Sequence, residues 1–160
     1  MDSGCWVNSQ SGRRKQDFGP KANFKKKKAK LGSFAGMPRV MFPLYERIKR
    51  THKILEDYAP VECLFLEYEP DKGAHIDPHF DDNWLWGECI MSLSLLSDSV
   101  MTLSRETPGR LEEIPIKIPA RSLLVLSGES RHVLKHSIKK EFANTNNDIE
   151  VNIYNLRVTR

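Results

Sequence analysis

From Glu62 onward the chain is a succession of short apolar runs separated by turns rich in Pro, Gly, Ser and Asp, a pattern typical of short β-strands. One helix precedes them over residues 40–58, where apolar residues recur at near-helical spacing and Pro60 follows the end. Seven or eight strands after one helix predict a mainly β sandwich or barrel. The expected strands cover 62–68, 75–81, 89–96, 100–105, 114–118, 121–127, 132–138 and 150–158, with 89–96 and 100–105 forming a hairpin around 97–99.

Length and composition restrict the class of protein further. With 160 residues, 39% of them hydrophobic, the chain has room for one domain with a real core. No apolar run approaches the ~18 residues of a membrane-spanning helix, and the first twenty residues lack the apolar centre of a signal peptide. Cys5, Cys63 and Cys89 include no CxxC pair and therefore predict neither a disulfide framework nor a zinc cluster. We expect a soluble intracellular protein without a membrane partner.

Positive charge is concentrated near the amino terminus. Between Arg13 and Lys30 nine Lys or Arg face a single acid, Asp17, so this segment carries +8 and the rest of the +4 chain carries −4. Such a segment indicates contact with nucleic acid or an acidic partner, a localisation signal, or simply a solvated run of like charges. We expect residues 1–37 to form a basic irregular arm and residues 38–160 to form the folded domain.

One polar stretch, residues 75–82, carries residue types suited to metal chemistry. His79 and Asp81 are two apart, and residues two apart on a strand point to the same face. A further His from another strand would complete a two-His, one-carboxylate triad, which holds Fe(II) and leaves positions open in non-haem iron oxygenases. Spacing alone leaves His75 and Asp77 as alternatives, leaves the later His as either His132 or His136, and also allows two surface polar residues on a strand.

The spacing of these motifs resembles the AlkB-like Fe(II)/2-oxoglutarate dioxygenases. In that family an HxD pair precedes a Ser-x-Ser strand by about a dozen residues, as His79–Asp81 precedes Ser92–Ser94 here. A later segment, 123–131, followed by His136 in a His-x-Ile context, matches the family's distal histidine. The resemblance therefore implies His79, Asp81 and His136 as the iron ligands. The segments 10–20, 76–82 and 84–88 further resemble the subfamily of the fourth animal AlkB homologue.

This resemblance implies a double-stranded β-helix, or jelly-roll, that uses Fe(II), 2-oxoglutarate and O2. It implies oxidative removal of a methyl group from a monomethylated lysine of actin, with links to N6-methyladenine in DNA and to actomyosin function in cell division. Cytoplasmic and nuclear locations both follow from it. A zinc-dependent β-barrel hydrolase remains an alternative reading of the same residues.

The resemblance also implies roles for further residues, each with a structural alternative. Tyr68 corresponds to a tyrosine that contacts 2-oxoglutarate, or is a core aromatic. Trp84 and Trp86 shape the substrate mouth or pack. Arg13 and Arg14 match a substrate-side arm, or are solvated, and Asp82 is expected to orient a ligand.

The carboxyl-terminal region departs from the family pattern. Family members carry an arginine-rich final strand that clamps the 2-oxoglutarate carboxylates, but 141–148 replaces it here and arginine returns only at Arg157 and Arg160. The sequence therefore looks truncated at both ends or alternatively spliced. Arg157 would be a substitute clamp if 150–158 forms the closing strand. The alternative function is a catalytically impaired chain that binds actin or nucleic acid through its basic arm.

Overall fold

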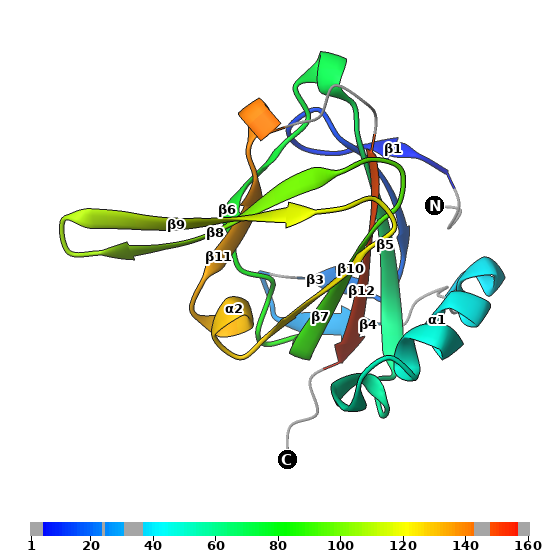
Figure 1. Ribbon diagram of the computed structural model, residues 1–160. Coiled ribbons are helices and arrows are strands. Elements are labelled where there is room, and N and C mark those ends of the chain that lie inside the picture. Colours follow the sequence, from blue (N-terminus) through cyan, green and yellow to red (C-terminus); the bar gives the residue numbers. More distant parts are fainter. Residues whose placement is uncertain (1–4, 24, 31–36, 143–147, 157–160) are drawn as a thin grey trace.

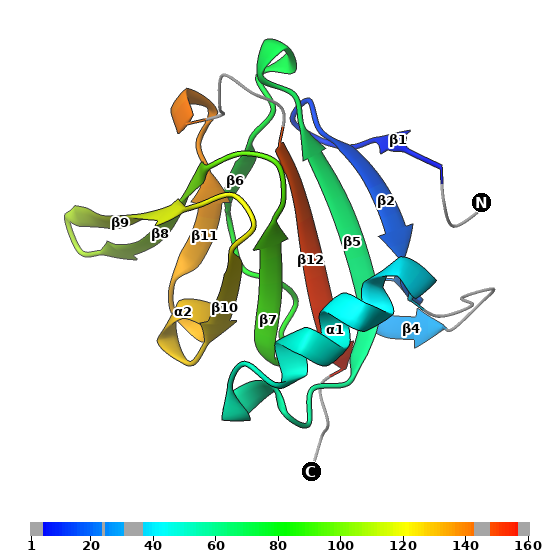
Figure 2. The same ribbon diagram turned by 45° about the vertical axis from the view of Figure 1, so that its right-hand side comes forward.

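Two β-sheets make up most of the computed structural model, which describes residues 5–23, 25–30, 37–142 and 148–156. The larger sheet has six strands in the order β1-β2-β5-β12-β7-β10, and the smaller has four in the order β6-β11-β8-β9. Figures 1 and 2 show the sheets side by side, with α1 on the outer side of the larger one. The elements are β1 (Val7–Asn8), β2 (Arg14–Phe18), β3 (Lys21–Asn23), β4 (Lys28–Lys30), α1 (Phe42–Lys49), β5 (Pro60–Tyr68), β6 (Ile76–His79), β7 (Trp86–Ser94), β8 (Ser99–Thr107), β9 (Arg110–Ile118), β10 (Leu123–Ser127), α2 (Glu129–His132), β11 (Lys135–Ile138) and β12 (Asp148–Leu156). The predicted mainly β jelly-roll with one helix near its start is confirmed.

The helix is shorter than its apolar spacing predicted. After α1 ends at Lys49, His52 adopts an extended backbone, and its ring nitrogen accepts a hydrogen bond from the Ile54 amide. This side-chain cap starts a separate 3-10 turn over Lys53–Leu55, so 40–58 is not one continuous helix. No helix in the described part of the chain has the length and apolar character needed to cross a membrane.

The expected hairpin of 89–96 and 100–105 does not form. β7 pairs with β12 and β10, whereas β8 pairs with β9 and β11 in the other sheet. The link between β7 and β8 is therefore a crossover between sheets. The Asp148 carboxylate accepts hydrogen bonds from the amides of Leu96 and Ser97 and so anchors this crossover to the start of β12.

A strand expected over 150–158 is present as β12 over Asp148–Leu156, and residues 157 and 158 lie outside the described part of the chain. β12 lies between β5 and β7 and is antiparallel to both. Its Val151 and Ile153 are fully buried in the cluster that includes Ile48 of α1, while Glu150 and Tyr154 point to the other side, into the space between the sheets. Arg157, the arginine considered as a substitute clamp, and Arg160 both lie outside the described residues.

The basic arm is more regular than its composition suggested. β2 pairs with β5 and extends the larger sheet, and Phe18 packs edge-on against Phe65 with ring centroids 5.7 Å apart. β3 and β4 form a small hairpin whose lysines are exposed. The apolar side chain at Phe18 and the free edge of β5 explain why this part of 1–37 joins the domain.

Candidate metal centre and the jelly-roll interior

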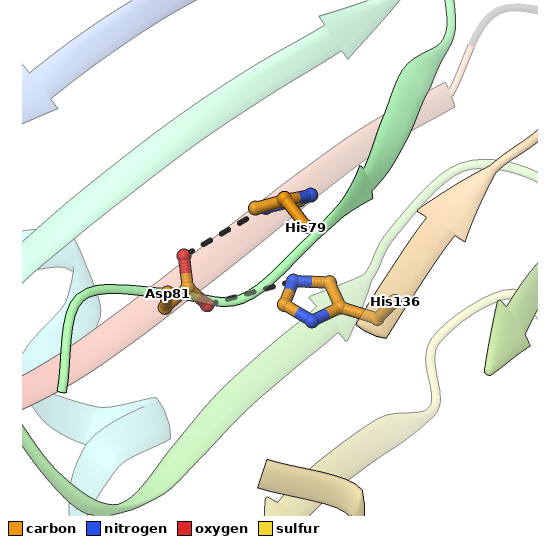
Figure 3. Close-up of side chains that lie close together, drawn as sticks. All are labelled: His79, Asp81 and His136. Carbon is orange, nitrogen blue, oxygen red and sulfur yellow. Dashed lines mark ion pairs between the residues drawn. The ribbon is translucent and has the colours of Figure 1, made fainter. Parts of the chain in front are cut away.

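Three predicted ligands meet where β6 and β11 pair. His79 ends β6 and lies opposite His136 of β11 in the antiparallel register, and Asp81 follows two residues after β6. One ligand atom from each of the three residues lies within 4.8 Å of the other two. Figure 3 shows the Asp81 carboxylate facing both imidazoles, with one ion-pair line to each ring. This is the one group of three or more potential metal ligands found within the described ranges.

Both imidazoles direct the same ring atom toward Asp81. His79 Nε2 lies 3.8 Å from Asp81 Oδ1, and His136 Nε2 lies 3.5 Å from Asp81 Oδ2. The two rings are 4.2 Å apart between centroids. Two nitrogens and a carboxylate at these separations fit a single divalent ion, and they leave coordination positions open as the non-haem iron class requires.

The surroundings of the two histidines favour metal ligation. His79 Nδ1 lies 2.8 Å from the Asp77 carbonyl oxygen, which selects the tautomer that donates from Nδ1 and leaves the Nε2 lone pair for a metal. Burial, the neighbouring His79 and the Arg131 charge lower the pKa of His136 to about 3, so this imidazole is neutral at pH 7. Ferrous ion needs neutral imidazole, and no proton must leave His136 first.

The Asp81 side chain is partly buried, with 16% of it exposed to solvent. Burial raises the pKa of its carboxyl group, and the nearby charges of His79 and Arg131 act in the opposite direction. Arg131 also donates from Nη1 to the Asp81 backbone oxygen at 2.9 Å, which fixes the turn that carries Asp81. A partly buried carboxylate is stabilised by a bound cation, so the donor set fits Fe(II).

The alternative ligands left open by the sequence lie elsewhere. His75 comes just before β6, and its Nδ1 lies 2.9 Å from the Gly73 carbonyl oxygen. His132 belongs to α2, not to a strand over 132–138, and its Nε2 contacts Glu88 at 2.8 Å. The helical turn before β11 therefore separates His132 from His136, although their spacing would place them on one face of an unbroken strand.

Two predicted substrate residues, Trp84 and Trp86, differ in position. Trp84 is partly buried and donates from Nε1 to Asp82 at 2.8 Å, so the Asp82 carboxylate orients Trp84, not a metal ligand. Trp86 is buried and stacks at 4.9 Å on Tyr154. This location favours the packing role for Trp86. A substrate contact by Trp84 stays a prediction.

Arg13 and Arg14 do not form one solvated arm. Arg14 donates to Glu67 at 2.5 Å and lies 3.3 Å from Glu69. Arg13 is only 8% exposed, and its guanidinium carbon lies 5.9 Å from the centroid of the Tyr68 ring. Arg13 therefore reaches the same interior as the tyrosine predicted to contact 2-oxoglutarate.

Glu150 of β12 is an interior residue that sequence reasoning missed. Its Oε2 accepts a hydrogen bond from the Tyr68 hydroxyl at 3.0 Å, and its Oε1 accepts one from the Ser92 hydroxyl. Burial raises the pKa of Glu150, while these two donors and the Arg13 charge act to lower it. The alternation of β12 places Glu150 on the face opposite Val151 and Ile153, and no local signal indicates that this second face is also covered.

The fold and the histidine-aspartate cluster define a class, the jelly-roll oxygenases that use non-haem iron. A model of the 2OG-Fe(II) oxygenase superfamily matches residues 7–158, and the chain belongs to this superfamily. Its members are dioxygenases that use Fe(II), 2-oxoglutarate and O2, as predicted. A solved structure, that of OsALKBH1, shares the fold with a TM-score of 0.62 at 11% identity over 96% of this chain and 85% of that one.

Sequence comparison identifies relatives within the AlkB-like branch. The chain is 42% identical over 168 residues to the human alpha-ketoglutarate-dependent dioxygenase alkB homolog 4, a match that covers 88% of this chain and 55% of the relative. It is 43% identical over 139 residues to a DNA N6-methyl adenine demethylase of Caenorhabditis elegans, with 86% and 47% covered. The resemblance to the fourth animal AlkB homologue is thereby confirmed. The chain spans about half the length of these curated relatives.

Proposed function

We propose that this chain is an Fe(II)/2-oxoglutarate-dependent oxidative demethylase that removes a methyl group from nitrogen. The observation that carries the proposal is the convergence of His79, Asp81 and His136 within 4.8 Å, on a fold that belongs to the 2OG-Fe(II) oxygenase superfamily. The names of both relatives support the same chemistry, since one is a dioxygenase and the other a demethylase.

The overall reaction balances without any further oxidant. An N-methyl amine, 2-oxoglutarate and O2 give the free amine, formaldehyde, succinate and CO2. Bound iron would supply the activation of O2. The chain's own part is to present two neutral imidazole nitrogens and one carboxylate on one side of the ion and to keep the remaining positions accessible. Trp84, which donates to Asp82, the residue that follows Asp81 in the sequence, is the proposed substrate contact.

For the substrate we propose first a monomethylated lysine on a protein such as actin. The motifs at 10–20, 76–82 and 84–88 support this choice through their resemblance to the subfamily. Regulation of actomyosin in cell division, in cytoplasm and nucleus, would follow. N6-methyladenine in DNA is the second substrate, favoured by the worm relative and by the exposed lysines of the β3–β4 hairpin.

Turnover on defined substrates tests the proposal. The purified chain would be incubated with Fe(II), 2-oxoglutarate and O2 and with either a monomethyl-lysine actin peptide or an N6-methyladenine oligonucleotide. Formaldehyde and succinate should appear in equal amounts with one of them, and His79→Ala should abolish both products. Turnover that survives His79→Ala would show that the assigned cluster does not carry the reaction.

A second candidate function is binding without catalysis, through the basic arm. Glu150 favours it, because β12 presents a carboxylate to the interior and the nine described residues of β12 include no Lys or Arg. Calorimetric titration separates the candidates. An active demethylase binds 2-oxoglutarate, whereas a binding-only chain associates with actin or DNA and shows no heat with 2-oxoglutarate.

A further inference from the structure

A carboxylate of the chain itself sits among carboxylate-binding donors inside the jelly-roll. Both oxygens of Glu150 accept a hydroxyl hydrogen bond, one from Tyr68 on β5 and one from Ser92 on β7. The register explains the convergence, since Glu150 lies between Leu66 and Ser94 on the strands to either side. Only 6% of Glu150 is exposed to solvent.

A cation completes this environment. The guanidinium carbon of Arg13 lies 5.9 Å from the centroid of the Tyr68 ring, and the positive charge of Arg13 acts to lower the pKa of Glu150. Arg13 Nε donates a hydrogen bond to the Gln10 carbonyl oxygen at 3.2 Å. Two hydroxyls and a guanidinium are the groups that proteins use to bind a free carboxylate.

We propose that Glu150 is a tethered carboxylate that occupies the donors of Tyr68 and Ser92, so that a free carboxylate ligand must displace it to bind in the interior. The competing ligand is the second carboxylate of a dicarboxylic 2-oxo acid. The identity of this competing ligand rests on the proposed function. The occupation of the Tyr68 and Ser92 hydroxyls by Glu150 does not, because it involves residues of the chain alone.

The competition follows from proton counting and from charge. Each hydroxyl has one proton to donate, so Tyr68 and Ser92 cannot serve Glu150 and a second carboxylate at the same time. A second anion in the same buried space would also be repelled by an ionised Glu150, because water screens the charges poorly there. Glu150 therefore disfavours 2-oxoglutarate relative to a 2-oxo acid that has one carboxylate.

Emptying the site gives a test that needs no iron. In Glu150→Ala the two hydroxyls lose their acceptor, and a small carboxylate should take its place. Sodium acetate, compared with sodium chloride at equal ionic strength, should raise the Tm of Glu150→Ala saturably and leave the wild-type Tm unchanged. Adding Tyr68→Phe should remove most of the acetate effect, since one of the two donors is gone.

Ligand titration tests the consequence for the cosubstrate. In the anaerobic Fe(II)-loaded protein, Glu150→Ala and Glu150→Gln should both bind 2-oxoglutarate more tightly than wild type, by about tenfold to a hundredfold, the value of one charge-assisted hydrogen bond. Binding of 2-oxobutyrate, which has no second carboxylate, should not change. Glu150→Gln keeps the size of the side chain and so serves if Glu150→Ala does not fold.

Glu62→Gln is the matched control, a buried carboxyl on β5 that pairs across to Tyr154. It should leave both the acetate response and the 2-oxoglutarate affinity as in wild type. Equal acetate effects on wild type and Glu150→Ala, or unchanged 2-oxoglutarate affinity in both Glu150 variants, would overturn the proposal. An acetate response without any turnover would instead support the tethered carboxylate and refute the demethylase.

Discussion

His79 and His136 are direct partners in the antiparallel pairing of β6 and β11, and their rings lie 4.2 Å apart. Because backbone pairing fixes the two residues opposite each other, the separation of the imidazoles does not depend on a flexible loop. Asp81, held by the bond from Arg131 to its backbone, supplies the third group. The site is thus built mainly from sheet geometry, and this gives it its rigidity.

Glu62 should make the stability of the protein fall with rising pH. Burial, with Asp17 nearby, raises the pKa of Glu62 to about 8. Below about pH 4.5 the group is protonated in both states, and between about 4.5 and 8 only the folded state keeps the proton. The unfolding free energy should therefore decrease over this window by about 5 kcal/mol in total, at about 1.4 kcal/mol per pH unit. Urea unfolding of wild type and Glu62→Gln from pH 4.5 to 8 measures it.

Glu62→Gln cannot ionise, so its unfolding free energy should change less over the same window. Asp17, an exposed acid near Glu62, is the comparison, and Asp17→Asn should keep most of the wild-type decline. If the unfolding free energy fell equally with pH in wild type and Glu62→Gln, the Glu62 carboxyl would have to be ionised in the folded protein, against the prediction.

Ile153 should contribute strongly to stability because its side chain is fully buried. It lies on the face of β12 that packs against the cluster with Ile48 of α1. Ile153→Ala removes buried methylene groups and leaves a cavity, which costs about 2 to 5 kcal/mol of unfolding free energy. Ile114 on β9 is 53% exposed, and Ile114→Ala should change the unfolding free energy by less than about 0.5 kcal/mol. Chemical denaturation compares the two, and a similar loss in both would contradict the assigned core.

The β3–β4 hairpin should determine affinity for polyanions. Lys25, Lys26, Lys27 and Lys28 are exposed around its turn, and Ala22 of β3 packs against the hydrophobic cluster that includes Trp84 and Trp86. Replacing the four lysines by alanine should weaken DNA binding and lower the slope of log K against log salt by about 0.7 to 0.9 for each phosphate that is no longer neutralised. Fluorescence anisotropy over a salt series measures the slope. As a control with the same change in charge, Lys49, Lys117, Lys135 and Lys139 would be replaced together by alanine. An equal loss of DNA affinity in this control would show that net charge, not the hairpin, determines the binding.

Much of the strand content could be predicted from the sequence, since alternation and turn residues are local signals. The strand predicted over 62–68 corresponds to β5, whereas the choice of His79 and Asp81 over His75 and Asp77 needed family motifs. Which strands pair is a long-range property, and β7 and β8 were therefore assigned to a hairpin although they lie in different sheets. The choice of His136 over His132 needed family motifs, because α2 interrupts the expected strand.

The burial of Arg13 could not be predicted for a related reason. Its neighbours in sequence are polar and basic, and only the pairing of β2 with the edge of β5 brings Arg13 to Tyr68. The hydrogen-bond partners of Glu150, Ser92 and Tyr68, are likewise distant from it in sequence, so these contacts could not be predicted. Interior polar contacts of this kind depend on the register between neighbouring strands. A hydrophobic pattern shows which face of a strand a residue occupies, but it does not show which residue of the next strand lies beside it.

Ferrous-ion binding tests the central claim most directly. Anaerobic equilibrium dialysis of the full chain should give one bound Fe(II) per chain, and Asp81→Ala and His136→Ala should each abolish binding. His75→Ala and His132→Ala, which remove histidines outside the cluster, should keep it. Loss of binding in His75→Ala or His132→Ala, or full binding in His136→Ala, would contradict the assigned metal centre.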